Sequence, residues 1–380
     1  MRLLHIADIH IGVAGHAFGE RAVDLRDRIQ KAFARALKLA PERDCDLVVV
    51  AGDLFDSNRV GQSTVQRAVN AMEDALQQAP GLHIILIPGN HDCLGEGSVY
   101  HAPEFDTPGE RFHLITDPEG ETVQFPDLDA AVHAVPYVCS FNQRSVSMLE
   151  RMEPDPDMSF NIGVVHAGHP EQYYGEKAAP EVTADDIAES GMDYIALGHI
   201  HSAGDCDAGG VVARYPGPLE LISSDCKPGA ALIVDLDEDG VRVQSEPMAT
   251  LKRESLEILG AELTSTGDLR ERIADVADKD TLVEVSITGM LPVGVTLNID
   301  RLLQEFREST YRLNIDDRTI AADLDAADAD FAEELVIGQF VRLMQEKIEE
   351  AREAGDERAL KVASDALNYG VHLLRGGDLE

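Results

Sequence analysis

Short apolar runs, each ending in polar residues, recur through the first 250 residues of the chain. Five of them have the length and composition of buried strands, at residues 2–7, 47–51, 83–87, 161–165 and 194–197. Apolar residues recur at helical spacing near residues 24–39 and 62–78. Strands that alternate with helices are typical of α/β proteins, so we predict a layered α/β sandwich over residues 1–250.

The pattern changes after this point. Residues 251–315 alternate strand, helix, strand, helix and strand, which predicts a small β-α-β cap domain. Residues 316–328 are acidic and rich in alanine, which is typical of a linker. Residues 329–380 carry apolar positions at helical spacing in two runs, which predicts a helical hairpin.

Length and charge bound the class of protein. The chain has 380 residues, so two or three domains are expected, and its net charge is −38. Such acidity normally argues against a nucleic-acid partner, because phosphate binding favours a basic surface. Only eight basic residues are lysine, and we favour the alternative that the surface is adapted to a high-salt organism. The mean charge then says little about the active face.

The cysteines and the apolar runs indicate a cytoplasmic protein. The cysteine count is odd and no Cys-x-x-Cys pair occurs, so we expect reduced thiols at Cys45, Cys93, Cys139, Cys206 and Cys226. The first residues read as a strand rather than as a signal peptide. No apolar run approaches the ~20 residues of a membrane span, so no membrane association is expected.

Polar blocks follow the five predicted strands. Strand ends at one edge of a sheet converge, so residues far apart in sequence can meet there. The blocks are Asp8-Ile9-His10, Gly52-Asp53-Leu54-Phe55-Asp56, Gly89-Asn90-His91-Asp92, Val164-Val165-His166 and Gly198-His199-Ile200-His201.

The blocks differ in how specific they are. Asp8-x-His10 alone is more often a turn carboxylate beside a solvated histidine, and Gly-Asp-x-x-Asp also suits a turn with a helix cap. His166 alone would be a structural histidine, and His169 competes with it. Gly-Asn-His-Asp and Gly-His-x-His are stronger, because neither a turn nor a core requires those imidazoles. The five together in this order point to a metal centre.

The joint logic is that of a two-metal phosphoesterase. Two cations need a bridging carboxylate, for which Asp53 is the candidate, and such a pair activates water for attack on phosphorus. One site would add Asp8, His10 and His201, and the other would add Asn90, His166 and His199. Carboxylate, amide and imidazole without thiolate suit hard to borderline ions such as Mn²⁺ and disfavour structural zinc.

His91 follows a ligand and is the candidate catalytic residue. As an imidazolium it would steady the transition-state charge or protonate the leaving oxygen. Asp92 would orient it, and the alternative is that Asp92 only packs behind the ligands. Tentative DNA-backbone contacts are Arg21, Arg26, Arg28 and Arg59, although ordinary pairing with Asp24 and Asp27 explains them equally well.

These blocks resemble those of the calcineurin-like metallophosphoesterases. Residues 2–12, 51–59 and 197–201, with Tyr215-Pro216-Gly217-Pro218 downstream, resemble in particular the SbcD-type double-strand-break repair nucleases. The resemblance covers about two thirds of the chain and reaches the cap and tail by layout only. It implies a four-layer α/β/β/α sandwich and assigns Asp8, His10, Asp53, Asn90, His166, His199 and His201 to the metals and His91 to catalysis.

The family also sets expectations for activity and partners. It implies a 3′→5′ exonuclease and single-strand endonuclease acting on DNA ends with two Mn²⁺ per subunit, Mg²⁺ being the alternative. It implies a homodimer, nucleoid-associated when acting, whose C-terminal helices bind an SbcC-like coiled-coil ATPase. The cap would contact DNA. Archaeal and eukaryal members carry histidine where this chain has Asp56, a residue to which we assign no chemical step.

Two other functions remain open. The chain could be another calcineurin-like phosphoesterase, acting on a phosphoprotein or a nucleotide, although such an enzyme needs neither cap nor helical tail. It could also be a non-catalytic scaffold, against which the intact ligands in all five blocks argue.

Overall fold

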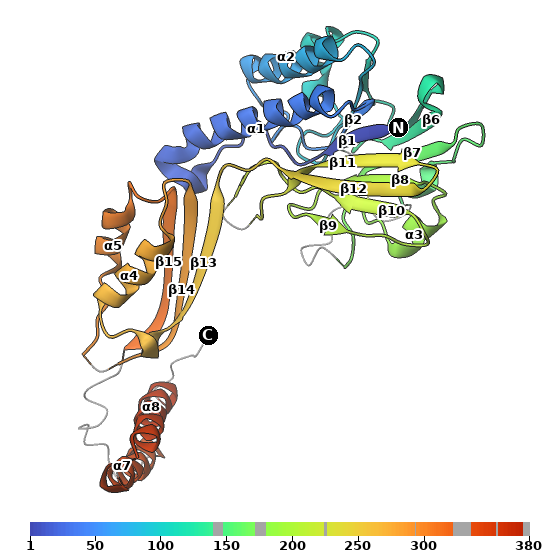
Figure 1. The fold of residues 1–380 in the computed structure, drawn as a ribbon. Coiled ribbons are helices and arrows are strands. Elements are labelled where there is room, and N and C mark those ends of the chain that lie inside the picture. The colour runs from blue at the N-terminus through green and yellow to red at the C-terminus, as the bar shows by residue number, and fades with distance from the viewer. Residues whose placement is uncertain are drawn as a thin grey trace. The chain divides into compact units, whose positions relative to one another are not determined.

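The computed structural model describes residues 1–139, 147–171, 180–223, 226–292, 294–321, 336–354 and 356–374. The chain divides into two compact units, Met1–Lys252 and Arg253–Glu380. The labels used below are those of Figure 1.

The first unit contains two six-stranded sheets. The first sheet has the order β12-β11-β1-β2-β3-β4. Its central strands β1, β2, β3 and β4 are parallel, whereas β11 and β12 form an antiparallel pair at the edge beside β1. The bounds are β1 (Arg2–Ile6), β2 (Leu47–Ala51), β3 (His83–Ile87), β4 (Phe112–Leu114), β11 (Ala230–Asp237) and β12 (Gly240–Pro247).

The second sheet has the order β5-β6-β7-β8-β10-β9. Its central strands β6, β7, β8 and β10 are parallel, and the edge strands β5 and β9 pair antiparallel to their neighbours. The bounds are β5 (Glu121–Phe125), β6 (Ala130–Val135), β7 (Phe160–His166), β8 (Tyr194–Gly198), β9 (Gly204–Asp205) and β10 (Val212–Tyr215).

The sheets pack face to face around a core that both supply. Alternate residues of β7 and β8 show the layering: Val164 and Ala196 face the first sheet, whereas Val165 and Leu197 pack on the outer side with Ile187 of α3 (Ala184–Glu189). Strands buried on both faces read as continuous apolar runs, which is the signal in the sequence. Helices α1 (Ala22–Glu42) and α2 (Gln62–Gln78) lie together over the first sheet (Figure 1). The predicted four-layer α/β/β/α sandwich is thus confirmed.

Helix α1 forms because its apolar residues recur on one face. Leu25, Ile29, Phe33 and Leu37 follow one another at four-residue spacing and are buried, with alanines filling the gaps between them. The opposite face carries charged residues, including the pair Lys31 and Asp27. The helix therefore covers the sheet that carries the first three polar blocks.

The second unit contains a three-stranded sheet in the order β13-β14-β15, with the element order strand, helix, strand, helix, strand. Its apolar core includes Ile258, Ile273, Val285, Leu302 and Phe306. The bounds are β13 (Lys252–Leu259), α4 (Thr266–Val276), β14 (Thr281–Leu291), α5 (Ile299–Phe306) and β15 (Arg312–Ala321).

Strand β15 corrects the predicted linker boundary. It continues to Ala321, through the first part of the segment 316–328 that its acidity marks as a linker. The reason is tertiary: β14 is long enough to pair with every residue of β15, from Leu282 with Arg312 to Leu291 with Ala321. Residues 322–328 lie outside the described part of the chain. Helices α7 (Val336–Ala354) and α8 (Glu357–Leu374) follow and pack on each other through Val341 and Leu367.

No helix in the described ranges combines the length and the apolar character that crossing a bilayer requires.

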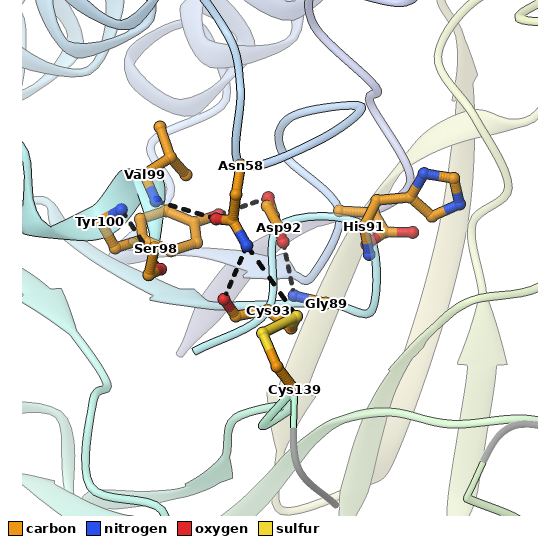
Figure 2. The surroundings of a disulfide bond; sticks show 10 residues. Asn58, Gly89, His91, Asp92, Cys93, Ser98, Val99, Tyr100 and Cys139 are labelled. Carbon is orange, nitrogen blue, oxygen red and sulfur yellow. Dashed lines mark hydrogen bonds between the residues drawn. A yellow bond between two sulfur atoms is a disulfide. The ribbon is translucent and has the colours of Figure 1, made fainter. Parts of the chain in front are cut away.

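Two of the five cysteines correct the expectation of reduced thiols. Cys93 and Cys139 form a disulfide (Figure 2). Cys45, Cys206 and Cys226 are buried and form no disulfide with any described residue. The two loops meet in a short parallel bridge between Leu94 and Val138, in which the Leu94 N–H donates to the carbonyl oxygen of Tyr137 and the Cys139 N–H donates to that of Leu94. Nothing in the spacing of 46 residues signals this pairing.

The two sheets approach each other closely where β2, β7 and β8 end. The His166 Nδ1–H donates to the carbonyl oxygen of Ala51 at 3.0 Å, which joins one sheet to the other. A Cβ on Gly198 would lie 1.9 Å from that carbonyl oxygen, and one on Gly52 would lie 2.2 Å from His166 Nδ1. Only glycine fits at both positions, so the glycines that precede Asp53 and His199 are required by this contact.

Gly198→Ala should therefore destabilise the first unit. We expect its free energy of unfolding to fall by roughly 1–3 kcal/mol or more, because the added methyl group must push the sheets apart. Calorimetry of the full chain measures this. The control is Gly81→Ala, where a Cβ would meet no atom within 4 Å. Equal stability of the two variants would contradict the close approach.

Loss of the disulfide should also destabilise this unit. In oxidised protein, Cys139→Ala should lower the free energy of unfolding by about 2–4 kcal/mol, because the cross-link restricts the unfolded chain. Urea unfolding followed by circular dichroism gives the value. A reductant should lower the stability of the wild type to that of the variant and leave the variant unchanged; a reductant without effect on the wild type would refute the cross-link.

Candidate metal centre

The backbone brings the first two blocks side by side. The N–H of Asp8 donates to the carbonyl oxygen of Gly52 at 3.2 Å. The N–H of His10 donates to the main-chain carbonyl oxygen of Asp53 at 3.0 Å. The N–H of Ile11 continues the ladder to Leu54 at 2.9 Å. The parallel pairing of β1 and β2 thus extends beyond the strands, which holds Asp8, His10 and Asp53 at one edge of the sheet.

Four residues of the centre have left-handed backbone conformations. The φ angles are 54° at Asp8, 53° at His10, 50° at Asp53 and 105° at His199. Residues with a Cβ rarely adopt such angles, and strain of this kind concentrates at functional sites. The turns direct these side chains into the space where the strands end.

The first predicted ligand group is assembled. Asp8, His10, Asp53 and His201 each place one ligand atom within 4.8 Å of the others. His10 Nε2 lies 3.0 Å from His201 Nε2 and 3.5 Å from Asp53 Oδ2. Three of the four side chains are buried, and His201 is partly exposed. The group can hold one divalent cation.

The second predicted group meets the first at Asp53. Asn90 Oδ1 lies 2.8 Å from His166 Nε2 and 3.0 Å from His199 Nδ1. His166 Nε2 is in turn 3.3 Å from Asp53 Oδ2, the same oxygen that faces His10. The structure therefore brings all seven predicted ligands together and places the Asp53 carboxylate between the two groups.

Burial and mutual charge set the protonation of the centre. Burial raises the pKa of Asp8 to about 7, and the Asp53 charge adds to this against the opposing effect of His166. Burial also opposes ionisation of Asp53, but His166 and His10 outweigh it and lower the pKa of Asp53. Burial would lower the pKa of His166, yet Asp53 raises it to about 9. A His166 imidazolium thus compensates the Asp53 charge in the absence of a cation.

Two other imidazoles are held neutral. Burial, assisted by the charge of His166, lowers the pKa of His199 to about 3. Burial and the charge of His10 lower the pKa of His201 to about 4. Neutral imidazole is the form that binds metal ions, so both side chains are ready to act as ligands at neutral pH.

The residues present fit divalent cations. Asp8 Oδ2 is buried and accepts no hydrogen bond from any described residue, although its partner oxygen accepts the N–H of His199 at 2.9 Å. A buried carboxylate oxygen without a partner is unfavourable unless a cation satisfies it. The donor set of carboxylate, amide and imidazole matches the chemistry of divalent metals.

His91 and Asp92 differ from expectation. The exposed His91 ring is directed away from Asp92, and its Nδ1–H donates to the carbonyl oxygen of Asp56 at 3.0 Å (Figure 2). Asp92 is buried and accepts hydrogen bonds from the N–H groups of Gly89 and Phe55 and from the Tyr100 hydroxyl. It therefore braces the loop rather than orienting the imidazole, because its oxygens are already engaged beneath that loop.

Sequence reasoning missed the contact of Asp56 with His10. Asp56 Oδ1 lies 3.3 Å from His10 Nδ1, and only the ladder between the two loops brings these residues together. His169, the competitor of His166, is buried and accepts the N–H of Glu171 through Nδ1.

The predicted arginines lie on several surfaces. Arg21 and Arg26 line an open pocket of about 670 Å³ that adjoins His10 through Ile11 and Gly12, and Arg67, which sequence reasoning missed, also lines it. Arg28 pairs with Asp24 at 2.6 Å. Arg59 is exposed on the loop that follows Asp56.

Comparison with known proteins identifies similar chains. The DNA double-strand break repair protein Mre11 of Methanopyrus kandleri is 27% identical over 346 residues, covering 84% of this chain and 73% of that protein. The Mre11 protein of Archaeoglobus fulgidus is 25% identical over 348 residues, covering 81% and 76%. A solved dimetal phosphatase from Danio rerio aligns with 65% of this chain and 96% of its own at 13% identity and a TM-score of 0.42.

The family model described as calcineurin-like phosphoesterase matches residues 1–203, more than half of the chain. All seven clustered ligands lie within this range. The chain therefore belongs to the calcineurin-like phosphoesterase family and is a metal-dependent hydrolase of phosphate esters.

Proposed function

We propose that this chain is the nuclease subunit of a DNA double-strand-break repair complex, a 3′→5′ exonuclease and single-strand endonuclease that acts on DNA ends. The observation that carries the proposal is the convergence of the six other predicted ligands around the Asp53 carboxylate. Such a centre suits phosphodiester hydrolysis at two metals.

The choice of DNA as substrate rests on the relatives. Both Mre11 proteins are similar over more than 80% of this chain, which is more than the first unit alone and therefore includes part of the second unit. A hydrolase of small phosphate esters has no need of a separate α/β unit and a helical hairpin.

The geometry supports an assignment of residues to two metals. Asp8, His10, Asp53 and His201 would hold one cation, and Asp53, Asn90, His166 and His199 the other. When bound, a pair of divalent cations supplies Lewis-acid polarisation and a strong nucleophile at neutral pH. Mn²⁺ suits the mixture of oxygen and imidazole donors, with Mg²⁺ as the alternative.

His91 would move the proton of the reaction. A carbonyl oxygen can only accept, so the contact with Asp56 keeps a proton on His91 Nδ1. As an imidazolium, with a proton on each nitrogen, His91 would donate its Nε2 proton to the leaving oxygen of the phosphodiester and be left as the neutral Nδ1–H tautomer. The backbone N–H of His91 donates to Asp53 Oδ1 at 2.8 Å, which keeps this residue beside the metal ligands.

Contacts to DNA would come from individual arginines rather than from a basic surface. Arg21, Arg26 and Arg67 line the pocket that adjoins Ile11 and Gly12, together with Glu20, Asp24 and Asp27, and these arginines would contact phosphates of the strand that leads into the centre. The cap would add contacts to the duplex. We propose that the protein works in a cytoplasm rich in salt. The salt would screen the net charge of −38 that the whole chain carries.

The partner proposal rests on the helical hairpin. Val336, Leu343 and Val362 are exposed on α7 and α8, an apolar surface that suits docking of partner helices. We propose an SbcC-like coiled-coil ATPase as that partner, together with a homodimer of this chain.

Asp53→Ala should abolish Mn²⁺-dependent cleavage. We expect a loss of more than about 100-fold, since losing a bridging ligand should exceed the ~10–100-fold effect of losing an outer partner. The measurement is hydrolysis of single- and double-stranded DNA with Mn²⁺ from low to multimolar salt, with chelator to remove the metal.

Exposed Asp74→Ala on α2 is the control and should cleave as the wild type does. Cleavage by Asp53→Ala would refute the two-metal centre, whereas a wild type that hydrolyses only a nucleotide or phosphoprotein would refute DNA as the substrate.

His91→Ala should keep metal and DNA binding but slow cleavage by about 10²–10⁴-fold, the usual contribution of a general acid. Isothermal titration with Mn²⁺ and single-turnover cleavage separate the two properties. The control is His101→Ala, an exposed histidine in the same loop region. Loss of Mn²⁺ from His91→Ala would reassign His91 as a ligand.

A further inference from the structure

Asp56 lies between two histidines of the metal centre and contacts each with a different group. Its carboxylate oxygen Oδ1 is 3.3 Å from His10 Nδ1, and its backbone carbonyl oxygen accepts from His91 Nδ1 at 3.0 Å. The two imidazole rings meet edge to face, with centroids 4.6 Å apart and an interplanar angle of 88°. Asp56 thus contacts both His10, a proposed ligand, and His91, the proposed proton donor.

The backbone fixes Asp56 in this place. Its N–H donates to the carbonyl oxygen of Ile11 at 3.1 Å, which closes the ladder that runs from Asp8 and Gly52 outward. Ile11 and Phe55 also form a parallel bridge. These bonds involve main-chain atoms on both sides, so the position of Asp56 beside His10 does not depend on its own side chain.

The carboxylate determines which nitrogen His10 offers to the centre. The 3.3 Å approach is a charge contact and not a formed hydrogen bond, since His10 Nδ1 has no hydrogen-bond partner among the described residues. A carboxylate can only accept hydrogen bonds and its negative charge favours a proton on the nitrogen it faces, which is Nδ1. Nε2, which faces Asp53 Oδ2 and His201 Nε2, then carries the lone pair. A carboxylate behind a ligating histidine fixes both the tautomer and the orientation of the ring.

We propose that Asp56 is the positioning residue of this centre: its side chain presents His10 Nε2 to the metal, and its main-chain carbonyl presents His91 Nε2 to the substrate. The inference rests on the metal roles given under the proposed function. The two roles can be tested separately. Substitution of the Asp56 side chain removes the contact with His10 and leaves the main-chain carbonyl that contacts His91.

The test is Mn²⁺ titration of the full chain stripped of metal. Asp56→Ala should bind one of two Mn²⁺ ions about 10–100-fold more weakly, the usual effect of losing a partner behind a metal ligand. Asp56→Asn should lose less, because the amide oxygen can take the place of the carboxylate oxygen that faces Nδ1. Both variants should keep a stoichiometry of two. Ser57→Ala, on the same loop, is the matched control and should bind as the wild type does.

Turnover supplies a second readout. At saturating Mn²⁺, Asp56→Ala should recover most of the wild-type kcat on a chromogenic phosphodiester, since the contact of His91 with the carbonyl remains. The loss should appear instead as a higher Mn²⁺ concentration for half-maximal rate. This split distinguishes positioning from a direct part in the reaction.

Two results would overturn the inference. Unchanged Mn²⁺ affinity in Asp56→Ala would make the contact with His10 incidental. A stoichiometry that falls to one in both variants would make Asp56 itself a ligand, as its grouping with His10 and His91 within 4.8 Å permits. Because Asp56 is 27% exposed, Asp56→Asn should fold even where the alanine variant does not. A chain that passes this test but cleaves no DNA would refute the proposed function and leave this inference standing.

Discussion

The metal centre depends on the contact between the two sheets at the ends of their central strands. Ala51 is the last residue of β2 in one sheet. Its carbonyl oxygen accepts a hydrogen bond from Nδ1–H of His166, which ends β7 in the other sheet. Gly198, at the end of β8, lies against the same carbonyl with no room for a side chain. Because the sheets touch here, side chains from the ends of β1, β3, β7 and β8 reach the Asp53 carboxylate at the end of β2. A wider separation would divide the predicted ligands between the sheets, with Asp8, His10, Asp53 and Asn90 on one side and the three histidines of β7 and β8 on the other.

The same contact concentrates charge that water cannot screen. Asp8 and Asp53 are both buried, and like charges in a poorly screened environment repel strongly. Burial would lower the pKa of His10 and of His166, yet the neighbouring carboxylates raise both, and protons on these histidines relieve part of the repulsion. The local electrostatics thus favour added cations, and the buried oxygen of Asp8 without a hydrogen bond points to the same conclusion. The close packing of the two sheets and the charges that it buries both favour a metal centre at this place.

The sequence predicts those features that depend on residues close together along the chain. Apolar runs followed by Gly-Asp, Gly-Asn and Gly-His report both a strand and the polar turn beyond it, so the sandwich and the seven clustered side chains follow from the pattern. Contacts between loops have no such signal. The pairing of Cys93 with Cys139, the bonds of Asp92 to Phe55 and Tyr100, and the contact of Asp56 with His10 arise from neighbours that only the folded chain creates. The length of β15 likewise depends on its partner strand.

The left-handed backbone angles at Asp8, His10 and Asp53 lower the stability of the fold, although they position side chains that the metal centre needs. Glycine would adopt these angles without steric penalty, and asparagine with less than most residues. A lineage freed from hydrolysis and selected only for heat resistance would therefore be expected to replace these positions first and gain stability as it lost the centre. Aspartate and histidine at these angles give up stability for the side chains that the centre requires.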